Sequence, residues 1–245
     1  RLRGLVMQIP QDVKLRPHPA KYSDAIVKVL AEKLIGYDKI LDCMSGVGKI
    51  TQIRKHGWKG KEIWCNELER EWATQATDAD VVVIGDAQDM HWAKDREFDA
   101  IAVSPPYGNR LSDHFECKDG SVRFTYRNHL GHDLDPDNGG RMQWGDEYRN
   151  LMITVWRECW RILRLDGLFI LNVSNHIREG KEIYVSEWHQ AVLGEMGFKL
   201  LEEIHIETPR LKFGRNRTAR VAFERIYVFL KPKFREEKDL IHGRK

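Results

Sequence analysis

The sequence lacks long hydrophobic runs, paired-cysteine motifs and a strong excess of charge of one sign. No apolar stretch approaches the roughly 20 residues that a membrane-spanning helix needs, and no signal-type apolar core follows the basic N-terminus. Its 245 residues are 42% hydrophobic and 31% charged, with a net charge of +3. We therefore expect a soluble, cytoplasmic globular protein with no membrane partner, present as a monomer or a homodimer.

The cysteines are scattered along the chain without a CxxC pair, at Cys43, Cys65, Cys117 and Cys159. Two of them lie in apolar, strand-like segments, which suits reduced thiols in the cytoplasm. We therefore expect no disulfide framework.

Short apolar segments alternate with helix-type segments along most of the chain. The apolar segments are 39–43, 62–66, 80–86, 98–104 and 167–173. Near-continuous apolar runs of this length are typical of parallel strands covered on both faces by helices. Two further strand-like segments, 198–207 and 221–231, flank a basic loop. The sequence thus predicts an α/β fold with a doubly wound, mostly parallel sheet and an antiparallel C-terminal hairpin at its edge.

The end of the first predicted strand has a glycine-containing turn. Asp42 is followed by Met44, Gly46 and Gly48, and a helical segment begins at Lys49. Glycines allow a tight turn and a close approach of the backbone to a ligand, and a helix N-terminus adds a positive dipole end. The spacing lacks the third glycine of the dinucleotide-binding motif, which argues against NAD or FAD.

Acidic residues also end the next two predicted strands. Glu67 follows the second strand, where its carboxylate could accept hydrogen bonds from ribose hydroxyls. Asp86, followed by Ala87, ends the third strand and could accept from an adenine amino group. Each acid alone would suit a helix cap or a solvated loop as well. Three acids at successive strand ends indicate a nucleoside-binding crevice.

The fourth predicted strand stops at Ser104-Pro105-Pro106-Tyr107. Together with D-x-x-x-G-x-G, the acid after the second strand and the G-D-A at 85–87, this tetrapeptide resembles the S-adenosylmethionine-dependent methyltransferases of nucleobase amino groups. These form the cytosine-N4 and adenine-N6 DNA methyltransferase family. The resemblance covers about residues 17–175 and implies a Rossmann-like class I methyltransferase sheet, with S-adenosylmethionine as cofactor.

The resemblance also implies roles for individual residues. The segment from His18 to Tyr22 is similar to the family segment that packs over the methionine end of the cofactor. The implied catalytic residues are Ser104, Pro105, Pro106 and Tyr107. The implied cofactor-binding residues are His18, Pro19, Tyr22, Asp42, Met44, Gly46, Gly48, Glu67, Asp86, Ala87 and Ser104.

The chemistry of amino groups gives the tetrapeptide a reason of its own. The amino nitrogen of a base is a poor nucleophile, because its lone pair is delocalised into the ring. Hydrogen bonds to Ser104 and to the Pro105 carbonyl would favour a pyramidal nitrogen, and Tyr107 offers a ring for stacking an extruded base. No covalent nucleophile is needed, and the chain has no Pro-Cys dipeptide of the kind that carbon-5 cytosine methyltransferases use.

The target base follows from the first residue of the tetrapeptide. In the family, serine there occurs mostly with cytosine-N4 activity and aspartate or asparagine mostly with adenine-N6 activity. We therefore expect methylation of cytosine N4 in double-stranded DNA, of the kind found in restriction–modification systems. Adenine N6, an RNA base amino group, and a non-catalytic nucleic-acid-binding subunit are the alternatives.

The rest of the chain is expected to belong to the same single domain, 1–245. Residues 17–107 would form the cofactor-binding and catalytic half, 108–145 an inserted recognition loop with few strand or helix signals, and 146–235 the remaining sheet with a basic loop at 209–220. Tyr126 and Trp144 of the insertion are candidates for base contact. The candidate nucleic-acid-binding residues are Arg110, Arg123, Arg127, Arg210, Lys212, Arg215, Arg217 and Arg220.

The insertion contains two pairs of potential zinc ligands. His114 and Cys117 form the first pair, and His129 and His132 form the second. This combination is not a strong zinc signature, because surface histidines are common. We expect no metal.

Overall fold

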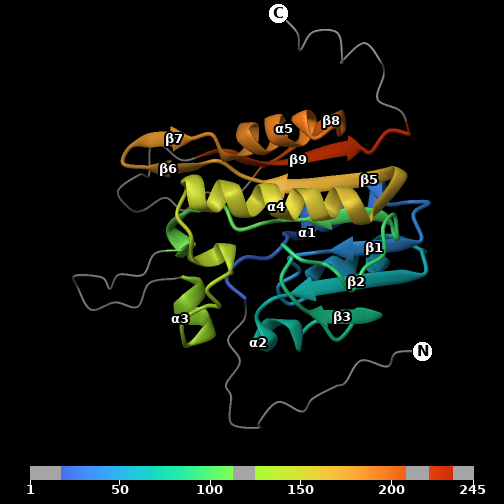
Figure 1. Cartoon of the computed structure of the whole chain (residues 1–245), viewed down its shortest axis with the longest axis horizontal. Coiled ribbons are helices and arrows are strands. Elements are labelled where there is room, and N and C mark those ends of the chain that lie inside the picture. Colours follow the sequence, from blue (N-terminus) through green and yellow to red (C-terminus); the bar gives the residue numbers. More distant parts are fainter. Residues whose placement is uncertain (1–17, 113–124, 208–220, 234–245) are drawn as a thin grey trace, which may run out of the picture.

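The computed structural model describes residues 18–112, 125–207 and 221–233, with the side chain of Arg110 left out. Seven strands form the main sheet, in the order β3-β2-β1-β4-β5-β9-β8 (Figure 1). The bounds of these strands are β1 Lys39–Asp42, β2 Glu62–Glu67, β3 Val81–Ile84, β4 Phe98–Val103, β5 Leu163–Val173, β8 Lys199–Glu207 and β9 Phe223–Leu230. β1 to β5 are parallel, while β9 runs antiparallel to both β5 and β8. The predicted doubly wound sheet with an antiparallel edge is therefore confirmed.

Helices lie on both faces of the sheet, with α4 in front of it and α1 behind it in Figure 1. The helical segments are α1 Asp24–Lys33, η1 Lys49–His56, α2 Arg70–Ala73, η2 Arg110–Ser112, α3 Tyr126–Leu130, η3 Gly139–Arg141, α4 Asp146–Ile162 and α5 Val185–Glu195. Segments η1, η2 and η3 are 3₁₀ helices. None of the helices in the described part of the chain combines the length and apolar composition needed to cross a bilayer.

The middle strands are buried on both faces, which explains their apolar sequences. In β5, Phe169 and Leu171 belong to one core cluster, which contains α4 and α5, whereas Leu168 and Ile170 belong to a second cluster with α1 and η1. Neighbouring residues of a strand point to opposite faces, so a strand between two cores must be apolar throughout. The cysteines in the described part of the chain, Cys43, Cys65 and Cys159, are buried free thiols.

Two parts of the structure differ from the sequence prediction. The insertion at 108–145, which has few helix signals, contains the short helices η2, α3 and η3. A second, two-stranded sheet pairs β6 His176–Arg178 with β7 Lys181–Ile183 and was not predicted. Its strands have three residues each and none is fully buried. Such short polar strands leave no alternating apolar pattern in a sequence.

Candidate active site

A crevice lies where the strand order reverses. β1 is flanked by β2 on one side and β4 on the other, so the loops that follow β1 and β4 border the switch point. Ligands of open α/β sheets bind at this position, outside the carboxyl ends of the strands. A cavity of about 320 Å³ is found there, within the usual size range of small-molecule sites. Its lining includes the turn after β1 and the tetrapeptide after β4.

The turn after β1 depends on its two glycines. Gly46 and Gly48 have φ angles of +54° and +72°, in the left-handed region that glycine adopts without strain. A Cβ atom on Gly48 would lie 2.6 Å from the Cβ of Ala76, so a side chain does not fit there. The Gly46 N–H donates to Glu67 Oε2 at 2.8 Å, which ties this turn to the end of β2.

Two of the predicted acids are deeply buried beside this turn. Asp42 accepts from the Tyr22 hydroxyl (3.2 Å) and from the Met44 N–H (3.3 Å). Glu67 accepts from the backbone of Gly46 and Glu69, one on each carboxylate oxygen. Burial raises the pKa of both carboxyl groups to about 7. The site therefore holds two acids that a positive charge would ionise.

The third acid lies in a more open position. Asp86 follows β3 and is half-buried, and both of its carboxylate oxygens accept hydrogen bonds from Gln88. Burial raises its pKa, while the hydrogen bonds from Gln88 oppose that change. Asp86 and Ala87 line the same cavity as Asp42 and Glu67.

The N-terminal candidates pack against the turn that follows β1. A Cβ on Gly46 would come within 3.3 Å of the His18 ring, and this ring packs edge-on against Trp72, with 4.2 Å between centroids. Burial lowers the pKa of His18 to about 4, so the imidazole is neutral at pH 7. His18, Pro19 and Tyr22 all line the cavity.

The tetrapeptide occupies the other side of the cavity. All four of its residues line the cavity, and Ser104 Oγ lies 3.0 Å from the Tyr107 hydroxyl. The Tyr148 hydroxyl of α4 donates to the Pro106 carbonyl at 2.5 Å, which holds the bend from below. The cofactor-side and tetrapeptide-side candidates, which are far apart in the sequence, are thus brought to one cavity.

Two polar residues from neighbouring strands complete this side. Asn172, near the end of β5, donates to Glu224 Oε2 at 3.2 Å, and Tyr107 donates to the same oxygen at 3.4 Å. Asn172 lies within the predicted apolar segment 167–173, whereas Glu224 was not predicted to line the site. The signal for Glu224 was one acidic residue within the apolar segment 221–231, at a position whose distance to Tyr107 the sequence does not reveal.

The insertion closes on itself and packs against the cofactor side. The Trp144 N–H donates to the Gly108 carbonyl at 3.0 Å, so the two ends of the insertion meet. Tyr126 is buried beside Trp72 and does not project from the surface. Trp144 packs against Trp188 and Tyr148. Neither ring extends from the molecule as a free base-stacking platform.

Glu69 fixes the middle of the insertion and was not predicted. Its Oε1 atom accepts from the Asp135 N–H and from Asn138 Nδ2, both at 2.8 Å. Asn138 and the adjoining Gly139 line the cavity, so this contact positions part of its wall.

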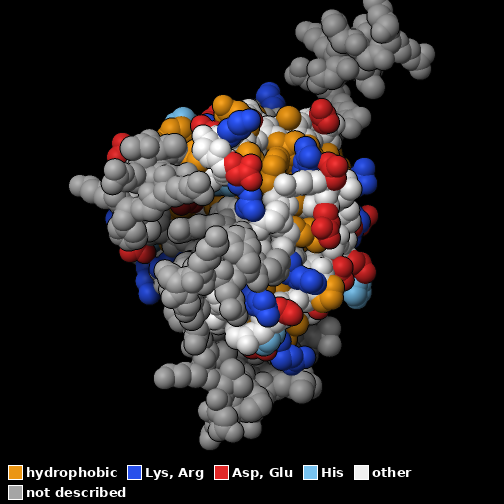
Figure 2. Space-filling model, turned by 90° about the vertical axis from the view of Figure 1, so that its left-hand side faces the viewer, with side chains coloured by type: hydrophobic (Ala, Val, Ile, Leu, Met, Phe, Trp, Pro, Cys, Tyr) orange, Lys and Arg blue, Asp and Glu red, His pale blue; other side chains and the backbone are white. Residues whose placement is uncertain are grey.

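The structure describes few of the candidate nucleic-acid-binding residues. Arg127 is half-exposed and pairs with Asp133 at 2.7 Å. Figure 2 shows basic and acidic side chains interspersed over the described surface of one face. The candidates that lie outside the described residues or side chains are Arg110, Arg123, Arg210, Lys212, Arg215, Arg217 and Arg220.

The potential zinc ligands are divided in the same way. His114 and Cys117 lie outside the described residues. His129 contacts the Thr125 carbonyl, and His132 contacts Glu71. The described part of the chain holds no group of three or more His, Cys, Asp or Glu side chains arranged for a metal ion.

Known structures share this fold at low sequence identity. One similar chain belongs to the complex between the Haloferax volcanii Trm112 methyltransferase activator and a methyltransferase, with a TM-score of 0.53, 12% identity, and 85% of this chain and 90% of that chain covered. The N-methyltransferase NodS from Bradyrhizobium japonicum has a TM-score of 0.51 at 12% identity, covering 84% and 93%. These likenesses concern the fold alone.

A comparison with curated protein sequences found no match. The family model described as DNA methylase, N6_N4_Mtase, matches residues 98–244, from the start of β4 through the tetrapeptide to the C-terminal part of the chain. The chain therefore belongs to the N6_N4_Mtase family of DNA methylases, and it is a methyltransferase whose cofactor is S-adenosylmethionine.

Proposed function

We propose that the protein methylates the exocyclic amino group of a base extruded from double-stranded DNA, with cytosine N4 as the favoured target. One observation carries the proposal: a single cavity is lined both by the acids at the ends of β1 and β2 and by the Ser-Pro-Pro-Tyr bend after β4. A cofactor on one side and an amino group on the other would meet within it.

The cofactor side suits a nucleoside that carries positive charge. S-adenosylmethionine supplies a methyl group on a cationic sulfur, which an amine can attack. Each oxygen of Glu67 already accepts one backbone N–H and keeps a lone pair that could accept from a ribose hydroxyl. Asp86 would accept from the adenine amino group, and His18 would cover the methionine end. Asp42 shapes the turn through Met44.

The tetrapeptide side would position the amino group. Ser104 Oγ and the Pro105 carbonyl would accept the two amino hydrogens, which turns the nitrogen lone pair out of conjugation. The Tyr107 ring would stack on the extruded base. The Tyr148 hydroxyl donates to the Pro106 carbonyl and so supports the bend in the conformation described.

The preference for cytosine rests on Ser104. A neutral hydroxyl is a weaker acceptor than a carboxylate, and serine at this position resembles the cytosine-N4 members of the family. Adenine N6 and RNA base amino groups share the same chemistry and are therefore outcomes of the test below.

The test is methyl transfer from tritium-labelled S-adenosylmethionine to unmodified plasmid DNA and, separately, to total RNA. Nucleoside mass spectrometry then identifies the product. We expect label in DNA as N4-methylcytosine. Label as N6-methyladenine, or only in RNA, would overturn the substrate assignment. Cofactor binding without any transfer would favour a non-catalytic nucleic-acid-binding subunit.

A matched variant links the transfer to this cavity. Tyr107→Ala removes the stacking ring but leaves the acids of β1 and β2 in place. We expect turnover to fall about 100-fold or more while cofactor affinity changes little. An equal loss of turnover and cofactor affinity would contradict a stacking role.

A further inference from the structure

Glu224 lies beside the tetrapeptide because of the register of β9. β5 and β9 are antiparallel, and the last pair of their ladder joins Val173 to Arg225. Glu224 is the next residue along β9, beyond the carboxyl end of β5, and it lines the cavity. An acidic side chain from the sheet edge therefore lies next to Ser104 and Tyr107.

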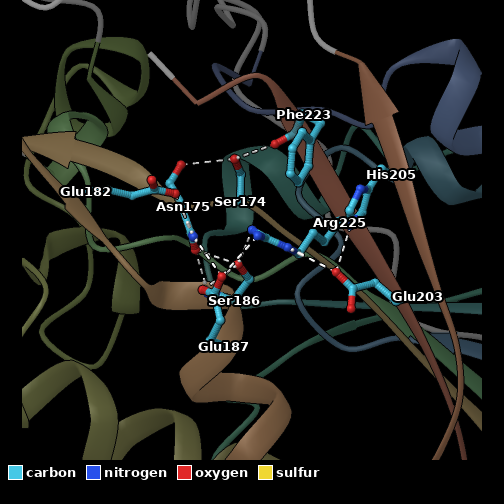
Figure 3. A network of polar contacts seen from close by, with 9 residues as sticks. All are labelled: Ser174, Asn175, Glu182, Ser186, Glu187, Glu203, His205, Phe223 and Arg225. Carbon is cyan, nitrogen blue, oxygen red and sulfur yellow. Dashed lines mark hydrogen bonds and ion pairs between the residues drawn. The ribbon is translucent and has the colours of Figure 1, made fainter. Parts of the chain in front are cut away.

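The neighbouring Arg225 fixes this orientation. Its guanidinium pairs with Glu187 at 3.0 Å and with Glu203 at 3.1 Å, and it donates to Ser186 Oγ at 2.8 Å (Figure 3). This polar network joins β8, β9 and the start of α5. Adjacent strand residues point to opposite faces, so an anchored Arg225 directs Glu224 toward the cavity.

The hydrogen bonds around Glu224 have a defined direction. An ionised carboxylate only accepts, so the Tyr107 hydroxyl must give its single proton to Glu224 Oε2. The 3.0 Å contact between Tyr107 and Ser104 then requires Ser104 Oγ to be the donor. Both lone pairs of Ser104 stay available for the hydrogens of an amino group. In the hydrogen-bonded series from Ser104 through Tyr107 to Glu224, the Glu224 carboxylate is therefore the only group that carries a formal negative charge.

We infer that Glu224 is the proton acceptor at the end of a relay that begins at Ser104, and this inference rests on the proposed function. The amino nitrogen gives its lone pair to the methyl carbon, and the carbon–sulfur bond breaks with its electrons on sulfur. The resulting N–H proton passes to Ser104 Oγ, the Ser104 proton passes to the Tyr107 oxygen, and the Tyr107 proton passes to the Glu224 carboxylate. All protons and electrons are accounted for, and no other base is required.

The Ser-Pro-Pro-Tyr tetrapeptide has no carboxylate of its own, and the relay connects it to the carboxylate of Glu224. The Ser104 hydroxyl is too weak a base to hold an additional proton at neutral pH, but the hydrogen bond that it donates to Tyr107 makes its oxygen a better acceptor. Burial raises the pKa of Glu224, and hydrogen bonds from Asn172 and Tyr107 oppose that change. The titratable groups that face Tyr107 from outside this chain are Tyr126 and Tyr22, and the Tyr22 hydroxyl donates to Asp42.

The first test compares the pH dependence of methyl transfer in three variants. Glu224→Gln keeps the size and an acceptor oxygen but cannot take a proton. We expect its rate at pH 8 to be about 100-fold lower and the loss of rate toward acid pH to disappear. Glu224→Asp restores the charge and should recover part of both. Tyr107→Phe keeps the ring, breaks the relay and should resemble Glu224→Gln.

The double variant separates the relay from packing. If Tyr107 and Glu224 act in series, Tyr107→Phe combined with Glu224→Gln is no slower than either single variant. A merely structural Glu224 would instead alter stability and cofactor affinity and leave the shape of the pH profile unchanged. That result, or a Glu224→Gln enzyme with wild-type rate and profile, would overturn the inference.

A second test needs neither cofactor nor substrate. In protein labelled with carbon-13 at glutamate carboxyl groups, the signal that Glu224→Gln removes should titrate above the ordinary pKa of glutamate. Tyr107→Phe should raise this pKa further, because it removes a donor that stabilises the carboxylate. A Glu224 pKa in the ordinary range of glutamate that Tyr107→Phe leaves unchanged would overturn the relay. If wild-type protein labels no nucleic acid, the proposed function fails, while this titration still decides the coupling.

Discussion

A buried chain of side chains supports the Pro-Pro bend from the side of α4. Trp156 Nε1–H donates to His189 Nδ1 at 3.1 Å, so His189 must carry its proton on Nε2. That proton is directed to the Tyr148 oxygen at 3.0 Å, and Tyr148 in turn donates to the Pro106 carbonyl. Burial lowers the pKa of His189 to about 3, so the ring stays neutral. Every donor in this chain therefore has one direction.

Removal of a single oxygen tests this chain. Tyr148→Phe leaves the His189 N–H and the Pro106 carbonyl without their partner, at a cost of about 1–3 kcal/mol in the free energy of unfolding. We expect turnover to fall at least tenfold with cofactor affinity unchanged, measured by labelled methyl transfer and by calorimetry. The control Tyr37→Phe removes a hydroxyl from the segment between α1 and β1, outside the cavity lining, and should leave turnover intact. Equal turnover of the two variants would contradict the role of Tyr148.

The burial of Asp42 predicts a pH-dependent stability. Its pKa is raised from 3.8 to about 7, so the folded protein binds a proton between these values that the unfolded chain has released. Ionising the buried carboxyl group lowers the free energy of unfolding. This loss of stability is absent at low pH and grows as the pH rises toward 7. Asp42→Asn removes the charge, keeps an acceptor oxygen for the Met44 N–H, and can donate from its amide nitrogen to the Tyr22 oxygen once that hydroxyl turns. We expect it to be more stable than wild type at pH 8 by about 1–3 kcal/mol, with no difference below pH 4. Urea unfolding at pH 4, 6 and 8 measures this, and a gain that is constant with pH would contradict it.

Among the elements, the insertion at 108–145 is held in position in part by the carboxylate of Glu69. Glu69 is buried and holds both Asp135 and Asn138, which lie in the wall of the cavity or next to it. Glu69→Ala removes both bonds. We expect about tenfold faster proteolysis between 131 and 141 and weaker cofactor binding, because local opening becomes easier.

The conservative change at the same position is the control for this effect. Glu69→Gln keeps the Oε1 acceptor and should protect the segment nearly as well as wild type. If Glu69→Ala digests at the wild-type rate, the insertion is held by its apolar contacts around Tyr126 and Leu134 instead.

Elements that carry a repeating apolar pattern could be predicted from the sequence. β5 is apolar at every position that contacts either core, and its neighbours in the sheet follow the same pattern. The strand-end argument also places Asp42, Glu67 and Ser104 at one crevice, because parallel strands present their carboxyl ends together.

Contacts between distant segments could not be predicted in this way. Glu224 is 117 residues from Tyr107 in the sequence, and His189 is 41 residues from Tyr148. Both meetings depend on the register of an antiparallel strand or on how two helices pack. No local period in the sequence encodes them.

At the scale of the whole molecule, one sheet separates two cores. Leu30 of α1 and Leu193 of α5 are buried in different clusters, on opposite faces of the sheet. Each Leu→Ala change should lower the free energy of unfolding by about 2–5 kcal/mol, through lost burial and an added cavity. Because the sites share no contacts, the two losses should add within about 0.5 kcal/mol in urea unfolding.

A surface change gives the baseline for this comparison. Ile35 is 66% exposed at the end of α1, so Ile35→Ala should alter the free energy of unfolding by less than about 0.5 kcal/mol. Strong coupling between Leu30→Ala and Leu193→Ala would show that the sheet transmits repacking from one face to the other.

The pairing of Gly108 with Trp144 has a consequence for how this protein could acquire new sequence preferences. Gly108 has a φ of +60°, and a Cβ there would lie 2.7 Å from the Trp144 nitrogen, so glycine is required where the two ends of the insertion meet. Everything between these residues leaves and rejoins the sheet at one closed point. A change of length within the segment therefore need not displace the strands, provided that Asn138 and Gly139 keep their places in the cavity wall. Under the proposed function, the sequence preference could then change while the chemistry of the cavity stays the same.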